Sequence, residues 1–197
     1  MIKLVVFTFA SLLFSCGITS SNIKSLVTKK RIWLDPENIP VCFHSSSESV
    51  RREIQSMVQE AFSETPLRFR GWESCGRLPH FPQIRISFTD SRTSSSYIGP
   101  ARRETTMTLS KDYWDRSAVH EFGHAVGLYH EHKRSDGDSC AKELQQSNSN
   151  NNSKVEDGDG VTYVGPYDRN SVMNYCNSNR GSSLSPGDIE GIQYLYK

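Results

Sequence analysis

Three histidines and one glutamate lie close together in the segment His120–His130. If this segment is helical, His120 and His124 lie on one face, because residues four positions apart meet along a helix, and both can bind one metal ion. Gly127 tolerates the left-handed backbone that ends a helix, and the turn after it can bring His130 to the same ion. Three imidazole nitrogens with one open position are typical of a catalytic zinc site. The sequence therefore predicts one catalytic Zn²⁺ bound by His120, His124 and His130.

Glu121 follows the first of these histidines and is placed to reach a water molecule on the metal rather than the metal itself. Zinc lowers the pKa of its bound water to about 7, and a carboxylate can take the proton as the water attacks a peptide carbonyl. The same carboxylate then hands the proton to the leaving amine. This chemistry predicts a zinc-dependent endopeptidase whose substrates are proteins or peptides.

Three other interpretations remain open at this stage. The histidines could be ordinary surface residues of a helix. The chain could be a zinc-binding, non-proteolytic surface module similar to an adhesin, but binding a metal alone requires no base at Glu121. It could also hydrolyse something other than protein.

A second motif, Ser171–Tyr175, follows after a long polar stretch and reads Ser-Val-Met-Asn-Tyr. A methionine turn downstream of an extended zinc motif is the mark of the metzincin class of metalloproteases. The chain resembles metzincins, and among them it is most similar to the astacin-like family. The similarity covers residues 31–197, including Ser96–Gly99 and Leu184–Ile189. After the zinc motif, four further residues match the family pattern: Glu131, Arg134, Asp136 and Tyr175.

The resemblance implies a fold and several residue roles. The expected fold is α+β: a twisted, mixed five-stranded sheet with two long helices, an active-site cleft, and a C-terminal subdomain holding the methionine turn and a last helix. Tyr175 is implied to bind zinc at rest and then to swing and stabilise the oxyanion, although a plain core tyrosine is the alternative. Met173 is a floor beneath the zinc, and Ser95–Ile98 is an edge strand for substrate.

Other positions are assigned smaller roles or depart from the family pattern. Glu131 resembles the glutamate that binds the mature amino terminus in this family. Arg134 and Asp136 are expected to form a structural pair, and His132, outside the ligand spacing, is expected on the surface. Leu128 stands where the family commonly has an aromatic residue, and Gly137 where it commonly has an arginine. The motif His-Glu-Phe-Gly-His also resembles that of matrixins, so a matrixin-like peptidase is the nearest alternative assignment within the class.

Periodicity places the elements that must position these residues. Alternation of apolar and polar residues predicts strands, and apolar residues three and four apart predict helices. We expect Asp115 to cap the zinc helix, with Val119, Phe122 and Val126 facing the core. The expected strands are 39–44, 67–72, 83–88, 94–99 and 106–110. Besides the zinc helix, we expect one helix that is capped within Ser45–Ser49 and runs to Phe62, and a last helix that begins at Pro186 after a Ser185 cap.

The stretch Cys140–Asn170 is rich in Ser, Asn and Gly. It is expected to be a long irregular loop, mobile at Ser147–Ser153. Asp157–Gly160 faintly resembles a calcium loop but lacks the rest of an EF-hand pattern, so turn chemistry is favoured.

Length and charge limit the remaining possibilities. The chain has 197 residues and a formal net charge of +1, without a basic stripe, so we expect it to bind no nucleic acid. We also expect a monomer. Residues 1–15 are typical of a signal peptide, with an N-terminal membrane anchor as the alternative. Cys16 resembles the lipidated cysteine of a bacterial lipoprotein, which predicts a lipid anchor and export to the outer surface, the periplasm or the medium. Residues 16–30 are expected to be a tether and 31–197 the catalytic domain.

The five cysteines support export. Setting Cys16 aside leaves four, and a four-cysteine zinc site is disfavoured because no Cys-x-x-Cys pair exists. Four cysteines allow three disulfide pairings in an oxidising compartment. We favour Cys42 with Cys75 and Cys140 with Cys176, since the second bond would clamp the long loop between the zinc helix and the methionine turn.

Overall fold

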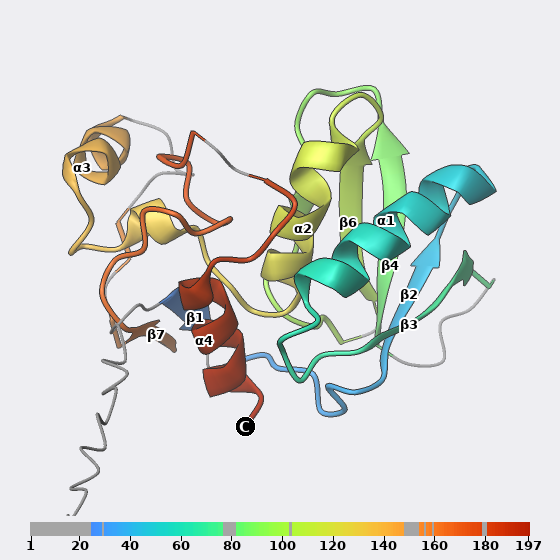
Figure 1. The fold of residues 1–197 in the computed structure, drawn as a ribbon, viewed down its shortest axis with the longest axis horizontal. Coiled ribbons are helices and arrows are strands. Elements are labelled where there is room, and N and C mark those ends of the chain that lie inside the picture. Colours follow the sequence, from blue (N-terminus) through green and yellow to red (C-terminus); the bar gives the residue numbers. More distant parts are fainter. Residues whose placement is uncertain are drawn as a thin grey trace, which may run out of the picture.

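The computed structural model describes residues 25–28, 30–76, 82–102, 104–147, 154–155, 157–158, 160–178 and 181–197. Its helices are α1 (Glu48–Ala61), α2 (Trp114–Ala125), α3 (Ser139–Gln146) and α4 (Pro186–Leu195), with a 3-10 turn at Glu131–Lys133. Its strands are β1 (Ser25–Thr28), β2 (Ile39–Phe43), β3 (Phe69–Ser74), β4 (Gln83–Thr89), β5 (Ser95–Ser96), β6 (Glu104–Ser110) and β7 (Val161–Val164). Figure 1 shows the large sheet with α1 and α2 in one half of the molecule, and α3, α4 and the β1–β7 pair in the other.

The large sheet has five strands in the order β3-β2-β4-β6-β5. The first four strands run parallel to their neighbours, and β5 runs antiparallel to β6. The register places Val41 beside Ile84, and Ile86 lies between Phe43 and Met107. All five of these side chains are buried, since period-two alternation puts one row of apolar residues on one face. The expected mixed five-stranded sheet is confirmed, and β5 forms its edge.

Helices α1 and α2 pack against the sheet and against each other. Ser47 caps α1 by accepting a hydrogen bond from the backbone N–H of Val50. Ile54 and Val58 of α1 are fully buried in the same apolar cluster as Phe122 of α2. Phe122 meets Phe69 and Trp72 of β3, with ring centroids 5.0 and 5.7 Å apart. These contacts fix α2, the helix that carries the histidine motif, against the sheet.

The start of α2 differs from expectation. The helix begins at Trp114, and its N-cap residue is Tyr113, whose side chain makes no capping hydrogen bond. Asp115 lies in the first helical turn instead of the cap, where its negative charge faces the positive end of the helix dipole. The prediction of an Asp115 cap was wrong by two residues. Val119, Phe122 and Val126 are buried, as predicted.

The N-terminal side of the domain also differs from expectation. Residues 25–28, expected in a tether, form β1 and pair antiparallel with β7, with Ser25 opposite Val164 and Thr28 opposite Val161. All four residues of β1 are buried, because the strand lies under α4, where Gly191 closely approaches Ser25. The folded part of the chain therefore includes β1, Ser25–Thr28. Residues 1–24, with the expected signal peptide and Cys16, lie outside the described part of the chain.

The segment after the histidine motif is more regular than expected. Cys140 lies in α3, which Asp138 caps by accepting from the backbone N–H of Ala141, and β7 follows later. The segment expected to be mobile lies mostly outside the described residues, since Ser147 alone of it is described. Gly158 and Gly160 have positive φ, and Asp157 accepts a hydrogen bond from Thr162, as turn chemistry predicts.

Both expected disulfides are present. Cys42 of β2 is bonded to Cys75, which follows β3, and Cys140 of α3 is bonded to Cys176. The last helix also matches expectation, because Ser185 and Asp188 form a capping box and Pro186 opens the first turn. None of the described helices combines the length and the apolar character needed to cross a bilayer.

Candidate metal centre and catalytic site

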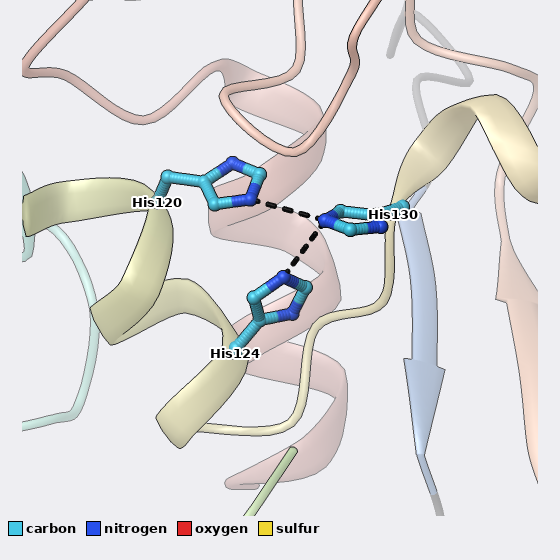
Figure 2. Close-up of side chains that lie close together, drawn as sticks. All are labelled: His120, His124 and His130. Carbon is cyan, nitrogen blue, oxygen red and sulfur yellow. Dashed lines mark hydrogen bonds between the residues drawn. The ribbon is translucent and has the colours of Figure 1, made fainter. Parts of the chain in front are cut away.

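Three imidazole nitrogens converge on one point between α2 and the segment that follows it (Figure 2). Nε2 of His130 lies 3.2 Å from Nε2 of His120 and 3.0 Å from Nε2 of His124. His120 and His124 lie one turn apart on α2, and both are more than nine-tenths buried. The predicted ligand set is thus brought together as the sequence spacing implied.

Backbone carbonyls select the tautomer of two of the rings. Nδ1 of His120 lies 2.8 Å from the carbonyl oxygen of Val172, and Nδ1 of His124 lies 2.8 Å from that of Leu128. A carbonyl oxygen can only accept, so in both rings Nδ1 carries the hydrogen and donates it. In the neutral imidazole the lone pair is then on Nε2, directed at the point of convergence.

The arrangement fits a zinc ion. Nitrogen ligands of tetrahedral zinc lie about 2.0–2.1 Å from the metal, which separates them from each other by about 3.3 Å. Burial lowers the pKa of His124 to about 3, and burial with the neighbouring imidazoles lowers that of His130 even further. His124 and His130 are thus held neutral at physiological pH, and a neutral imidazole with its lone pair directed at the point of convergence is the form that binds a metal cation.

The turn after α2 depends on Gly127. Its φ is +107°, and its N–H donates to the carbonyl oxygen of His124 at 2.9 Å. A β-carbon at this position would lie 3.0 Å from side-chain atoms of both Thr28 and Leu195. The glycine therefore supplies both the left-handed backbone and the close approach that let the chain return with His130.

The methionine turn lies against the histidine helix. A β-carbon on Gly123 would come within 2.6 Å of the sulfur of Met173, so the buried methionine side chain occupies the space beside that glycine. The carbonyl oxygen of Met173 accepts from the N–H of Glu131 at 3.1 Å, next to the ligand His130. The turn thus contacts both α2, which carries two of the histidines, and the segment that carries His130.

Glu121 lies in α2 between the two helical histidines and is 4 % exposed. Burial raises the pKa of its carboxyl to about 8. Its Oε2 atom has no hydrogen-bond partner within the described residues. A buried carboxyl oxygen without a protein partner is costly unless a ligand satisfies it, and a water molecule at the metal would do so.

The raised pKa of Glu121 predicts a pH effect on the metal-free protein. Between pH 4.5 and about 8 the unfolded chain releases this proton while the folded chain keeps it, so stability falls as pH rises, by about 1.4 kcal/mol per pH unit. Glu121→Gln removes this loss. We expect urea unfolding of the chelator-treated proteins to give similar stabilities below pH 4.5 and a more stable variant above pH 8. An equal difference at both pH values would contradict the shift.

Glu131 and Arg134 form a buried network close to the candidate metal centre. Both side chains are 1 % exposed, and the Oε1 atom of Glu131 lies 3.5 Å from Nε of Arg134. Glu131 also accepts from the backbone N–H groups of Leu26, at 3.0 Å, and Asp168, at 2.9 Å. In this chain an internal amide of β1 thus donates to Glu131, the residue at which the family resemblance implies a terminal ammonium group.

Arg134 and Asp136 form the structural pair that was predicted. Nε and one terminal nitrogen of Arg134 donate to the two carboxylate oxygens of Asp136, at 2.8 and 2.6 Å. The hydrogen bond from this guanidinium lowers the pKa of Asp136. The pair tethers the chain that leaves the metal centre.

Tyr175 lies beside the metal centre, and so does a residue that sequence reasoning placed elsewhere. The ring of Tyr175 is 4.4 Å from that of His130 and 5.9 Å from that of His120. His132, expected on the surface, is 0 % exposed, because the 3-10 turn directs it inward against Tyr175, with ring centroids 4.5 Å apart. Its position two residues after His130 gives no sequence signal for this contact.

Comparison with known proteins identifies relatives over most of the chain. The sequence profile of the astacin peptidase family matches residues 25–193. Zinc metalloproteinase nas-3 of Caenorhabditis elegans is 33 % identical over 192 residues, which span 86 % of this chain and 62 % of that protein. Zinc metalloproteinase nas-2 of the same organism is 30 % identical over 84 % of this chain and 61 % of its own length. The chain thus spans about three-fifths of these two relatives.

Solved structures show the same fold. The structure of myroilysin superimposes with a TM-score of 0.64 at 24 % identity, covering 87 % of this chain and 98 % of that one. High choriolytic enzyme 1, a hatching enzyme zinc-protease from the medaka Oryzias latipes, superimposes with a TM-score of 0.61 at 21 % identity, covering 86 % and 94 % of the two chains. At these low sequence identities, both similarities show that the fold is shared.

Proposed function

The chain belongs to the astacin family of peptidases, and on this premise we propose that it is a zinc-dependent endopeptidase acting on proteins or peptides. The family match favours the astacin-like over the matrixin-like assignment. Of the relatives named above, two are zinc metalloproteinases and one is a hatching enzyme zinc-protease by name.

The observation that carries the proposal is the convergence of three buried imidazoles beside one buried carboxyl. His120, His124 and His130 would hold the zinc through Nε2, with a fourth position left for water or substrate. When bound, zinc supplies Lewis acidity, which activates water and polarises the scissile carbonyl. Glu121, whose Oε2 lacks a protein partner among the described residues, is the base that accepts the proton and later delivers it to the leaving amine.

Tyr175 is proposed as the second catalytic residue. The residue is 39 % exposed, and its ring contacts those of His120 and His130. Asn174 and Cys176 hold the turn on either side: the side chain of Asn174 donates to the carbonyl oxygen of Asp168 and accepts from the N–H of Cys176. A phenol on a fixed turn beside the centre can donate a hydrogen bond to the oxyanion as it forms.

Substrate is proposed to bind along the edge strand. β5 pairs with β6 on one side and is the last strand in the sheet order. An extended peptide can add to such an edge as a further antiparallel strand. The edge is connected to the metal centre, because the N–H of Gly99 donates to the carbonyl oxygen of His124 at 2.8 Å. A peptide on this edge would therefore pass close to the convergent imidazoles.

Removal of the metal tests this function. Purified protein is expected to bind one zinc per chain and to cleave casein or gelatin. Dialysis against a chelator should abolish cleavage, and stoichiometric Zn²⁺ should restore it, since apo protein keeps its imidazoles but lacks the Lewis acid. Zinc is measured by atomic emission and cleavage by fluorescent casein. Full zinc occupancy without cleavage of any protein would instead support the non-proteolytic binding module.

Export and the boundaries of the chain's parts are proposed on separate grounds. The two disulfides require an oxidising compartment to form and persist, which supports export. We propose a monomeric catalytic domain beginning at residue 25, preceded by a signal peptide and a lipid anchor at Cys16. Mass spectrometry of the purified N-terminus would test both processing and lipidation.

A further inference from the structure

His132 belongs to a group of aromatic rings at the candidate metal centre. Its ring is stacked on Tyr175, with centroids 4.5 Å apart and planes inclined by 24°. It is also stacked on His130, at 5.1 Å and 26°. Tyr175 in turn is stacked on His120, at 5.9 Å and 27°. Tyr175 is therefore stacked on both His120 and His132, and His132 makes the closer of these two stacked contacts. The ring of His130, 4.4 Å away, is tilted by 49° to the tyrosine ring.

We propose that His132 is a positioning residue that holds the ring of Tyr175 by stacking and so fixes the plane in which the phenol moves at the metal centre. The proposal rests on the proposed function, since it assigns a role to Tyr175 in catalysis. It concerns the shape and place of the imidazole ring.

The backbone of His132 is held firmly enough to serve this purpose. Its carbonyl oxygen accepts from the side-chain amide of Gln145 at 2.6 Å, and the same amide donates to the carbonyl oxygen of Arg134 at 2.9 Å. The carbonyl oxygen of Lys133 accepts from the N–H of Val155 at 2.9 Å. The 3-10 turn is thus tied to α3 and to residue 155, so a completely buried ring is presented on a backbone with little freedom.

A support of this kind matters because Tyr175 is only partly buried. Tyr175 is 39 % exposed as a residue, whereas His132 is 0 % exposed. A half-exposed tyrosine would sample several rotamers, and each would place the hydroxyl differently. Stacking on a fixed ring narrows this distribution without blocking motion parallel to the stack. A flexible aliphatic side chain at position 132 could fill the same volume but would offer no plane.

The experiment compares His132→Leu with His132→Phe, which keeps a planar ring, in the full folded chain. We expect His132→Leu to lower kcat for a fluorogenic peptide by roughly threefold to tenfold, with KM and zinc content unchanged. His132→Phe should recover kcat to within about twofold. In a Tyr175→Phe background, His132→Leu should cause no further loss, because the two residues act through one group.

A readout independent of activity follows the ring itself. In metal-free protein labelled with ¹³C at the tyrosine rings, the resonance of Tyr175 is assigned by its absence in Tyr175→Phe. His132→Leu is expected to shift this resonance, and His132→Phe to keep a ring-current shift of similar size. If His132→Leu does not fold, His132→Met, which is also flexible and apolar, takes its place.

Three results would overturn the proposal: an unchanged Tyr175 resonance in His132→Leu, kinetic losses that add in the double variant, or an equal loss of zinc in both His132 variants. The last would show that the ring supports His130 instead. If the wild-type protein binds zinc but cleaves nothing, the proposed function fails while the resonance still reports whether His132 holds Tyr175.

Discussion

Glu121→Gln is expected to lower kcat/KM for peptide cleavage by about 10²–10⁴-fold while zinc content stays at the wild-type level. Glutamine keeps the size of the side chain and its place in α2 but cannot accept the proton from the attacking water. The three imidazoles and their carbonyl partners at Val172 and Leu128 are untouched by the change. The loss should therefore fall on the chemical step alone.

The matched control is Glu190→Gln, the same exchange at an exposed position on α4. It should leave cleavage and zinc content unchanged. Cleavage of a quenched fluorescent peptide and zinc by atomic emission, measured on the same samples, give both quantities. If Glu121→Gln retains more than a tenth of the wild-type rate, another group supplies the base, and the assignment of Glu121 is wrong.

Arg134→Leu is expected to destabilise the fold by about 3–5 kcal/mol, the largest stability effect among these variants. The guanidinium is 1 % exposed, lies 3.5 Å from Glu131, and also donates to Asp136 and to the carbonyl oxygen of Gly165. Without it, the carboxyl of Glu131 would remain buried with no opposite charge, and the carbonyl of Gly165 would lose its donor.

Arg169→Leu is the control for this prediction, because Arg169 pairs with Asp138 at the surface with 64 % of its side chain exposed. An exposed pair of this kind contributes about 0–1 kcal/mol. Urea unfolding of both variants under non-reducing conditions gives the comparison. Equal free energies of unfolding for the two variants would show that the Glu131–Arg134 pair contributes no more than a surface contact.

Local periodicity was sufficient to predict the sheet and the long helices. Ile39, Val41 and Phe43 occupy every second position of their segment, which is the period of a strand. The helix after Ser47 repeats its apolar residues at helical spacing. Such patterns depend on residues close together in the sequence, so they can be recognised without knowledge of the fold. The observed strands begin and end within a few residues of the predicted ones, apart from β5, which is much shorter.

The elements that were missed depend on distant partners. β1 was taken for part of a tether because four residues make too short a pattern, and its partner β7 lies more than one hundred residues away. α3 is short and largely polar, with two glutamines and a serine. In this helix, Ala141 and Leu144 are too few apolar residues to make a helical pattern. Its cap at Asp138 and its disulfide to Cys176 stabilise it in ways that composition does not reveal.

Some parts of the metal centre could be predicted from the sequence, and others could not. The ligand set followed from helical spacing plus a glycine turn, which are properties of one short segment. The acceptors for His120 and His124 are backbone carbonyls, which every residue has, so residue type could not identify Val172 or Leu128. The burial of His132 depends on a turn whose direction is set by Glu131 and Arg134, both held by residues far along the chain.

The hydrogen bond from the amide of Leu26 to Glu131 has a practical consequence for handling this protein. A peptide N–H, unlike a terminal ammonium, is present whether or not anything is attached upstream. A purification tag or a fluorescent fusion joined ahead of Ser25 can therefore be retained during crystallisation and kinetics, with no processing step needed to satisfy the buried carboxylate.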